Sequence, residues 1–252
     1  KQFFGTVNKS LNEITTGDIR GYLAHCKLVR HNTDQTINNK TRMLRGLFKW
    51  LTEEEYITKN PMLKIKDNKV EHRVKEVFTD EQITIVKDVA KEHSLRDIAI
   101  VDFLHRTGVR ISEMVALNRD DIDMHGRQCI VYGKGRKERP VYFNGEAAVH
   151  LKEYLESRTD DNPALFTTLD APYDRLKISG VEIRVRELGR KISMERIHPH
   201  KFRRTMATRA IDKGMPIEQV QKILGHSQID TTMQYAIVNQ NNVKASHRKY
   251  IA

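Results

Sequence analysis

Residues 224–235 read LGHSQIDTTMQY, a glycine and a histidine followed by a polar turn and then a tyrosine. Gly225 is suited to end a helix, because glycine adopts the left-handed backbone conformation without steric cost. His226 then lies in the turn, and Tyr235 follows nine residues later. A helical tyrosine is usually a packed residue with its hydroxyl satisfied, so Tyr235 alone gives no argument for catalysis.

A second polar group lies upstream, in the sequence IHPHKFRRT of residues 197–205. His200 and Arg203 are three residues apart at a predicted helix start, where Pro199 suits the first turn. His198 and His200 would also allow a metal pair. No third ligand stands at a usual spacing, so we expect no metal site.

The segment TGVRISE, residues 107–113, places Arg110 and Glu113 three positions apart. On a continuing helix they share one face, and Glu113 could orient the guanidinium of Arg110. An ordinary surface ion pair has the same spacing, and this segment alone favours that interpretation. Residues 98–104 precede this segment and are apolar enough to predict a buried helix.

Residues 128–143 change to an alternating pattern around Gly133-Lys134-Gly135, which predicts a β-hairpin with Lys134 near its turn. Tyr132 and Tyr142 flank the turn, and we expect them to pack. The glycines do not indicate a nucleotide site, because the sequence GxxxxGK followed by Ser or Thr is absent.

The N-terminal part of the chain predicts an amphipathic helix over residues 36–51. Arg42, Arg45 and Lys49 follow one another at steps of three and four, so they form a basic stripe on one face of that helix. A DNA phosphate backbone could bind along this stripe, although a solvated surface face has the same pattern.

The charged, weakly apolar stretch KIKDNKVEHRVKE predicts an exposed connector between two domains. We expect a helical domain at residues 1–66, a linker at 67–76 and a second domain at 77–252. The second domain is predicted to be mainly α-helical with a small β-hairpin. The chain begins with Lys1, so we expect the first domain to be truncated at its start.

The composition favours a polyanionic partner, with 44 Lys and Arg against 33 Asp and Glu and a formal net charge of +11. Cys26 and Cys129 are far apart in the chain and indicate neither a disulfide framework nor a zinc site. No apolar run approaches the roughly 18 residues of a membrane helix, and no signal peptide is evident. We expect a cytoplasmic protein.

The motifs TGVRISE, GKGRKER, HPHKFRRT and LGHSQIDTTMQY, in this order, resemble those of the tyrosine recombinases, the phage-integrase and Xer-type family. The resemblance spans both predicted domains. It implies a C-shaped DNA clamp made of a helical, SAM-like core-binding domain and an α+β catalytic domain. It also implies site-specific recombination through a 3′-phosphotyrosyl intermediate and a Holliday junction, with no cofactor.

The resemblance also implies which residues surround the scissile phosphate. They are Arg110, Lys134, His200, Arg203, His226 and Tyr235.

Elementary chemistry agrees with these roles. The two arginines can bind the non-bridging oxygens of the phosphate in a forked geometry. A phenol is mostly protonated at neutral pH, so Tyr235 needs a base, for which we expect His200. Lys134 would protonate the departing 5′ oxygen, and His226 would donate a hydrogen bond to the phosphate. Glu113 would hold Arg110.

Several positions leave alternatives open. Arg204 stands where many members of the family have a second histidine, and the neighbouring His198 competes with His200 as the base. Tyr250 competes with Tyr235, but it lies beyond the TTMQY segment. The tail after Tyr235 either docks into a neighbouring protomer or is a frayed terminus.

The expected partner is double-stranded DNA, bound by four protomers on two duplexes, with a free monomer and accessory DNA-bending proteins both possible. Integration or excision of a mobile element is the leading biological role. The alternatives are chromosome-dimer resolution by a Xer-type recombinase, DNA relaxation like that of a type IB topoisomerase, and a non-catalytic DNA-binding regulator.

Overall fold

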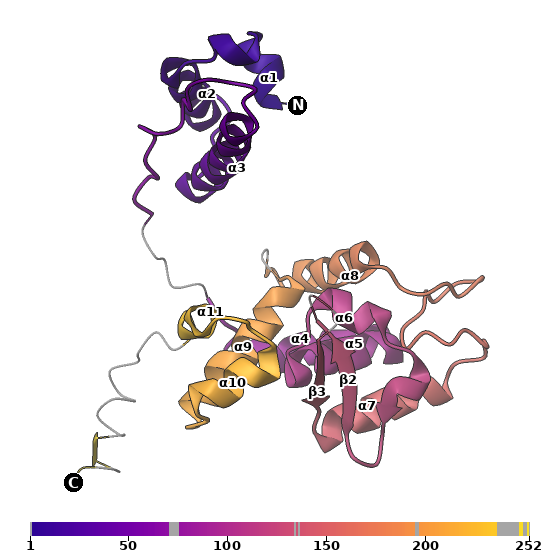
Figure 1. Ribbon diagram of the computed structural model, residues 1–252. Helices are drawn as coiled ribbons and strands as arrows, with labels where there is room; N and C mark the ends of the chain where they lie inside the picture. The colour runs from indigo at the N-terminus through magenta and orange to yellow at the C-terminus, as the bar shows by residue number, and fades with distance from the viewer. Residues whose placement is uncertain are drawn as a thin grey trace. The chain divides into compact units, whose positions relative to one another are not determined.

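The computed structural model describes residues 2–70, 76–133, 135, 137–194, 197–235, 247–248 and 251. The chain divides into two compact units, residues 1–73 and residues 74–252. Each unit has its own hydrophobic core. Figure 1 shows the helices and strands of both units.

The first unit is helical and contains α1 (Gln2–Val7), a 3₁₀ turn η1 (Leu11–Glu13), α2 (Thr16–Leu28) and α3 (Asp34–Glu53). Helix α2 begins with a capping box, in which the Thr15 side chain accepts from the Asp18 amide and the Asp18 carboxylate accepts from the Thr15 amide. The apolar stripe of α3 is buried in the core, which confirms the amphipathic helix predicted for residues 36–51.

The second unit is α-helical with one small sheet. Its elements are α4 (Asp80–His93), α5 (Leu95–Thr107), α6 (Ile111–Ala116), η2 (Arg119–Asp121), β1 (Ile122–Asp123), β2 (Gln128–Tyr132), β3 (Glu138–Tyr142), α7 (Gly145–Glu156), α8 (Ile178–Lys191), α9 (Pro199–Asp212), α10 (Ile217–Leu224) and α11 (Ile229–Met233).

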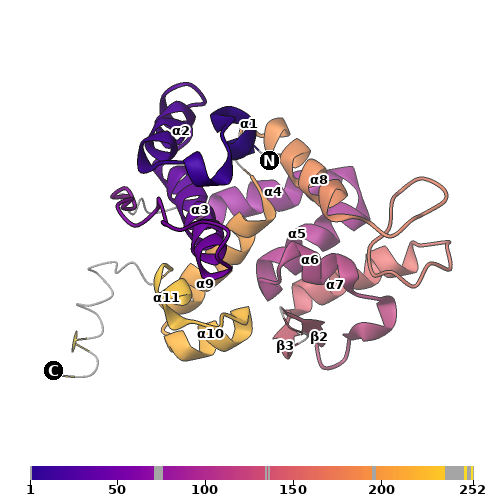
Figure 2. The ribbon, with the colours of Figure 1, turned by 45° about the horizontal axis from the view of Figure 1, so that its top comes forward.

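Helix α5 is the centre of the second unit and packs against α4, α7 and α9 (Figures 1 and 2). Nearly all of its residues are buried, as the apolar density of residues 98–104 predicts. The helix ends at Gly108, which has a φ of 61° in the left-handed region. This sharp end turns the chain directly into Arg110 at the start of α6.

The predicted hairpin is confirmed as the antiparallel pair β2 and β3, and the short strand β1 adds a third strand that the sequence pattern did not predict. The expectation that Tyr132 and Tyr142 pack is wrong, because they are 61% and 52% exposed. Strand alternation explains this: Cys129, Val131 and Val141 fill the inner face, so the even-numbered residues point outward.

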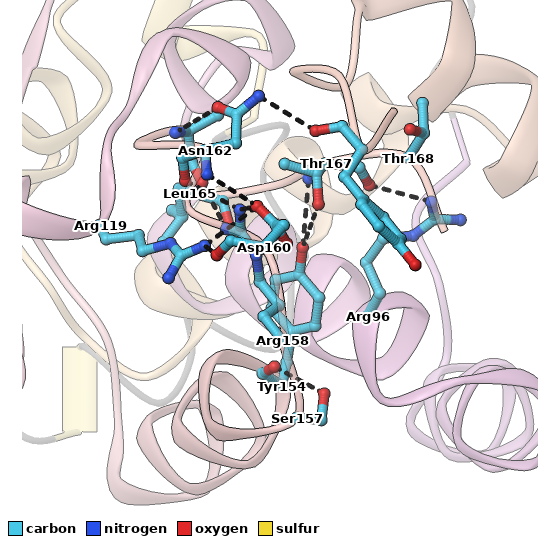
Figure 3. Close-up of polar contacts among 12 residues, drawn as sticks. Arg96, Arg119, Tyr154, Ser157, Arg158, Asp160, Asn162, Leu165, Thr167 and Thr168 are labelled. Atoms are coloured by element: carbon cyan, nitrogen blue, oxygen red, sulfur yellow. Dashed lines mark hydrogen bonds and ion pairs between the residues drawn. The ribbon is translucent and has the colours of Figure 1, made fainter. Parts of the chain in front are cut away.

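Between α7 and α8 the chain runs without regular structure and is held in place by the buried side chain of Arg158 (Figure 3). Its guanidinium donates to the carboxylate of Asp160 and to the main-chain carbonyl of Asn162. Arg119 donates to the same carboxylate at 3.1 Å. These bonds satisfy the polar groups of a long connection that leads into α8.

Within the described part of the chain, no helix is both long and apolar enough to cross a membrane.

Candidate active site

The C-terminal end of α10 forms the centre of the site, where it packs against α9, α11 and β3. Gly225 ends the helix with a φ of 63°. A side chain at this position would meet Arg139, because a Cβ built on Gly225 lies 2.9 Å from its Cδ atom. The last carbonyls of a helix have no partner within it and carry partial negative charge, so they attract cations.

Three arginines donate to these carbonyls. Arg139 Nε lies 2.8 Å from the Ile223 oxygen, and Arg203 NH2 lies 2.6 Å from the Leu224 oxygen. Arg110 reaches the same Leu224 oxygen at 3.4 Å and the following carbonyl, that of Gly225, at 3.2 Å. The end of one short helix therefore gathers guanidiniums from α9, β3 and the start of α6.

Glu113 is the carboxylate of this cluster, and its side chain is only 3% exposed. Oε1 accepts from Arg110 at 2.9 Å and from Arg139 at 2.8 Å, while Oε2 accepts from Arg139 at 2.7 Å. Burial raises the pKa of Glu113, but the bonds from Arg139 and from the Arg110 amide outweigh it and hold the pKa below its usual value. Glu113 is thus a buried anion shared by two arginines, and not part of a surface ion pair.

Arg203 is the most deeply buried of the three arginines, with an exposed fraction of 3%. Besides the bond to α10, it donates to the carbonyl of Gly108. Burial and then the charges of Arg110 and Arg139 lower the pKa of Arg203 to about 10. It remains a cation at neutral pH, so three guanidiniums face one carboxylate in this cluster.

His226 follows Gly225 and contacts the cluster directly. Its Nε2 atom lies 3.1 Å from Arg203 NH2, and its Nδ1 atom lies 2.8 Å from the hydroxyl of Thr232. Burial, followed by the charges of Arg203 and the two other arginines, lowers the pKa of His226 to about 4. The imidazole is therefore neutral at physiological pH.

Tyr235 lies just beyond α11, and its ring stacks on that of His226 with a centroid distance of 6.0 Å and an interplanar angle of 26°. It packs against a small apolar cluster formed by Ala207, Val220 and Leu224. The imidazole of His226 in turn contacts Arg203, with Nε2 3.1 Å from NH2. The structure thus brings Tyr235 together with His226 and Arg203.

His200 lies in the first turn of α9 and is exposed. Burial of part of the ring, followed by the charges of Arg203 and Arg110, lowers the pKa of His200. It is thus neutral at pH 7 and able to accept a proton. The ring of His198 lies 6.5 Å away, at the N-cap of the same helix. Among the described residues, no group of three His, Cys, Asp or Glu could hold a metal ion.

Lys134 lies outside the described residues. The residue before it, Gly133, is described and lies beside the cluster, because a Cβ built there would be 3.8 Å from Arg139 NH1 and 3.9 Å from Glu113 Oε1. The described N-terminal side of the hairpin turn therefore reaches the arginine cluster. Tyr250 and most of the tail after Tyr235 also lie outside the described residues.

Arg204, at the position where the resemblance implies a second histidine, forms a hydrogen bond outside the arginine cluster. Its NH1 atom donates to the main-chain carbonyl of Glu76 at 2.8 Å. The adjacent Arg203 takes the buried position, so the departure at Arg204 leaves the cluster intact.

The basic stripe of the first unit is partly neutralised. Arg42 and Arg45 both pair with Asp67, at 3.5 and 2.9 Å, and Lys49 lies 3.6 Å from Glu53. Arg42 and Lys49 are exposed on α3, and Arg45 is half-buried.

Sequence reasoning missed two residues of this site, Arg139 and Thr232. Arg139 lies within the quoted hairpin motif, and strand alternation places it on the same inner face as Val141. That alternation was the available signal. Thr232 lies inside LGHSQIDTTMQY, but nothing in the sequence distinguishes it from its exposed neighbour Thr231.

Known proteins resemble this chain in sequence over most of its length. The family model of the phage integrase family matches residues 76–242. Tyrosine recombinase XerC of Leptospira interrogans is 34% identical over 244 residues, which cover 94% of this chain and 78% of that protein. XerC of Bacillus licheniformis is 30% identical over 254 residues, covering 96% of this chain and 83% of that protein.

Solved structures agree in fold. The XerA recombinase has a TM-score of 0.63 and 26% identity, and the match covers 100% of this chain and 88% of that one. The Tn1549 transposon integrase, solved in complex with a circular intermediate DNA, has a TM-score of 0.79 at 20% identity and matches 98% of this chain and 91% of that one. This chain belongs to the phage integrase family of tyrosine recombinases, which cut and rejoin DNA strands.

Proposed function

We propose that this recombinase acts at specific DNA sites through a covalent bond between Tyr235 and a 3′ phosphate, and that it integrates and excises a mobile element. The observation that carries this proposal is the charge of the site: it gathers, among the described residues, three guanidiniums and only one buried carboxylate, that of Glu113. The surplus of two positive charges suits a phosphate that gains negative charge as it becomes pentacoordinate, so the transition state is bound more tightly than the substrate.

The reaction is a transesterification with two proton transfers. The Tyr235 hydroxyl oxygen attacks phosphorus while His200 takes the hydroxyl proton, and the bond from phosphorus to the 5′ oxygen breaks. Lys134 gives a proton to that oxygen, which leaves as a 5′ hydroxyl. Each proton transfer typically contributes about 10² to 10⁴ in rate.

Arg110 and Arg203 bind the two non-bridging oxygens of the phosphate, and His226 adds a hydrogen bond. The phosphotyrosine conserves the energy of the broken phosphodiester bond, so a 5′ hydroxyl from a second duplex can attack it without a cofactor. Exchange of one pair of strands gives a Holliday junction, and exchange of the second pair resolves it.

The proposed assembly is four protomers on two duplexes in the cytoplasm, with accessory DNA-bending proteins at some sites. Two domains, residues 1–66 and 77–252, contribute to DNA binding, and their clamp arrangement stays a prediction. The basic stripe on α3 is the proposed contact of the first domain. Phosphates would have to replace Asp67 as the partner of Arg42 and Arg45, since both arginines pair with it in the free protein.

A second candidate role, resolution of chromosome dimers, is favoured by the identity of 34% to a XerC recombinase over 94% of this chain. The two roles share one active site and differ in the DNA that is cut.

An experiment that captures the cut DNA distinguishes them. The protein is incubated with fragmented genomic DNA of its host and then denatured in detergent, so that only covalently bound strands stay attached to it. We expect their sequences to map to both ends of a mobile element. A single chromosomal site would support the Xer-type role instead.

The captured site then allows a test of recombination itself. Two duplexes that carry the site, one of them labelled, should yield exchanged products with the label in a new flanking sequence. Relaxation of a supercoiled plasmid without exchange would indicate a type IB topoisomerase activity. Binding without any cleavage would indicate a DNA-binding regulator.

A further inference from the structure

Thr232 is a buried residue of α11 that contacts both His226 and Tyr235. Its side chain is 0% exposed, and its hydroxyl lies 2.8 Å from His226 Nδ1. Its main-chain carbonyl accepts a hydrogen bond of 2.9 Å from the Tyr235 amide. His226 and Tyr235 therefore both hydrogen-bond to Thr232, the first to its hydroxyl and the second to its main-chain carbonyl.

The hydrogen bonds of His226 define which ring nitrogen carries the proton. Arg203 has donors only, so His226 Nε2 must accept the bond of 3.1 Å from Arg203 NH2. The ring is neutral, because burial and the neighbouring guanidiniums lower the pKa of His226 to about 4. The single proton is therefore on Nδ1, where it is donated to the Thr232 hydroxyl.

We propose that Thr232 is a positioning residue that couples the phosphate-binding His226 to the nucleophile Tyr235, its hydroxyl fixing the imidazole and its carbonyl fixing the tyrosine. The inference rests on the proposed function and deepens it, because neither the motif nor the family resemblance assigned Thr232 a role. Thr232 is hydrogen-bonded to both of the residues whose rings stack at a centroid distance of 6.0 Å.

The chemistry of a hydroxyl suits the change that a phosphate imposes on His226. A phosphate oxygen that replaces Arg203 at Nε2 is an acceptor, so Nε2 must then carry a proton. The ring either gains one proton from solvent or exchanges the Nδ1 proton for one at Nε2. Thr232 accepts from Nδ1 in the first case and donates to it in the second, because a hydroxyl does both. A methyl group in its place does neither.

The first test uses the free protein labelled with ¹⁵N in its histidines, with His226 assigned by its loss in His226→Gln. The ¹⁵N chemical shifts of the two ring nitrogens report which one is protonated. We expect the Nδ1–H form in the wild-type protein and a mixture of both forms in Thr232→Val. Wild-type His226 protonated on Nε2 would overturn the proposal, whatever the protein does to DNA.

The second test measures the single-turnover rate of covalent adduct formation on a nicked duplex that carries the captured site. Thr232→Val keeps the side-chain shape and removes the hydroxyl. We expect a rate about tenfold to a hundredfold below wild type, the usual effect of losing a partner that orients a reacting group. Thr232→Ser should restore most of the rate, and Thr231→Val, at the exposed neighbour, should leave it unchanged.

Coupling through His226 is separated from a packing effect by combining variants. On a His226→Gln background, Thr232→Val should lower the rate by less than twofold, because its target is already gone. Full additivity of the two changes would contradict the proposal, as would a Thr232→Val rate equal to wild type. If Thr232→Val does not fold, the ring proton of the wild-type protein and the Thr232→Ser rate still decide the matter. If wild-type His226 carries its proton on Nδ1 but the protein forms no adduct with DNA, only the proposed function is refuted.

Discussion

Arg139 and Glu113 form a two-pronged ion pair, with NH1 2.8 Å from Oε1 and NH2 2.7 Å from Oε2, and both side chains are at least nine-tenths buried. The pair joins strand β3 to helix α6. It also fixes the carboxylate that Arg110 needs, since Arg110 NH1 donates to the same Oε1 atom at 2.9 Å. The geometry of one phosphate-binding arginine is thus set by another arginine on a different element.

Removal of Arg139 should destabilise the protein strongly. Arg139→Met leaves Glu113 buried with only half of its partners, and breaking a buried pair typically costs about 3–5 kcal/mol. We expect a loss at the lower end of that range, since Arg110 remains. Urea unfolding followed by circular dichroism measures it. Arg186→Met, at an exposed position of α8, should change stability by less than about 0.5 kcal/mol. Equal stabilities of the two variants would refute the role of the pair.

Gly225→Ala should harm both stability and DNA cleavage. The φ of 63° strains any side chain, and the added Cβ would lie 2.9 Å from Arg139 Cδ. Gly214→Ala is a matched control, because Gly214 has a φ of 91° but nothing within 4 Å of its Cβ position. Both variants should lose about 1–3 kcal/mol from backbone strain. Only Gly225→Ala should slow adduct formation, and similar rates for both would show that Arg139 is not displaced.

Stability should fall as the pH decreases from 6.5 towards 4.5. Burial, and then the charges of Arg106 and Arg209, lower the pKa of His105 to about 3. The unfolded chain, with a histidine pKa near 6.5, binds the extra proton in this window while the folded protein does not. The folded state therefore loses up to about 1.4 kcal/mol for each pH unit below 6.5 from this histidine.

Urea unfolding at pH 4.5, 5.5 and 6.5 measures that slope. His105→Gln should make it shallower, since one titrating group is removed while an acceptor for Arg209 remains, and His226, with a pKa of about 4, still contributes. His125→Gln, at an exposed turn, should leave the slope as it is. A His105→Gln slope equal to that of wild type would show that His105 is not held neutral by the fold.

The basic stripe should contribute to the salt dependence of DNA binding. If Arg42 neutralises one phosphate, Arg42→Ala should reduce the slope of log K against log salt by about 0.9. Asp67→Asn should tighten binding, because it releases both Arg42 and Arg45 from their carboxylate partner. Lys152→Ala, which removes a paired lysine of α7, is the charge-matched control. An unchanged slope in Arg42→Ala would show that the stripe is a solvated surface and that Arg42 does not contact a phosphate.

Helices α3 and α5 and the hairpin could be predicted because each is defined by local signals. The apolar stripe of α3 and the apolar density of residues 98–104 lie within the helices that they specify. Strand β1 was missed because it has only two residues, Ile122 and Asp123, and forms by pairing with β2. A pattern of period two cannot be detected over two residues.

One contact of the candidate site could be predicted from local spacing, and its long-range contacts could not. The spacing of Arg110 and Glu113 suggested their contact, which the structure contains at 2.9 Å. The contact of Glu113 with Arg139, and that of Arg203 with the end of α10, join residues far apart in the sequence. No local pattern encodes such contacts. They arise from the packing of α9, α10 and β3.

The nucleophile is the central claim, and covalent capture tests it most directly. Tyr235→Phe keeps the ring that stacks on His226 and removes only the attacking oxygen. On a nicked duplex with the captured site, wild-type protein and Tyr250→Phe should form a detergent-stable adduct, with the nucleotide on the peptide of Tyr235 by mass spectrometry. Tyr235→Phe should bind the duplex with wild-type affinity and form no adduct. An adduct that persists in Tyr235→Phe would contradict the account.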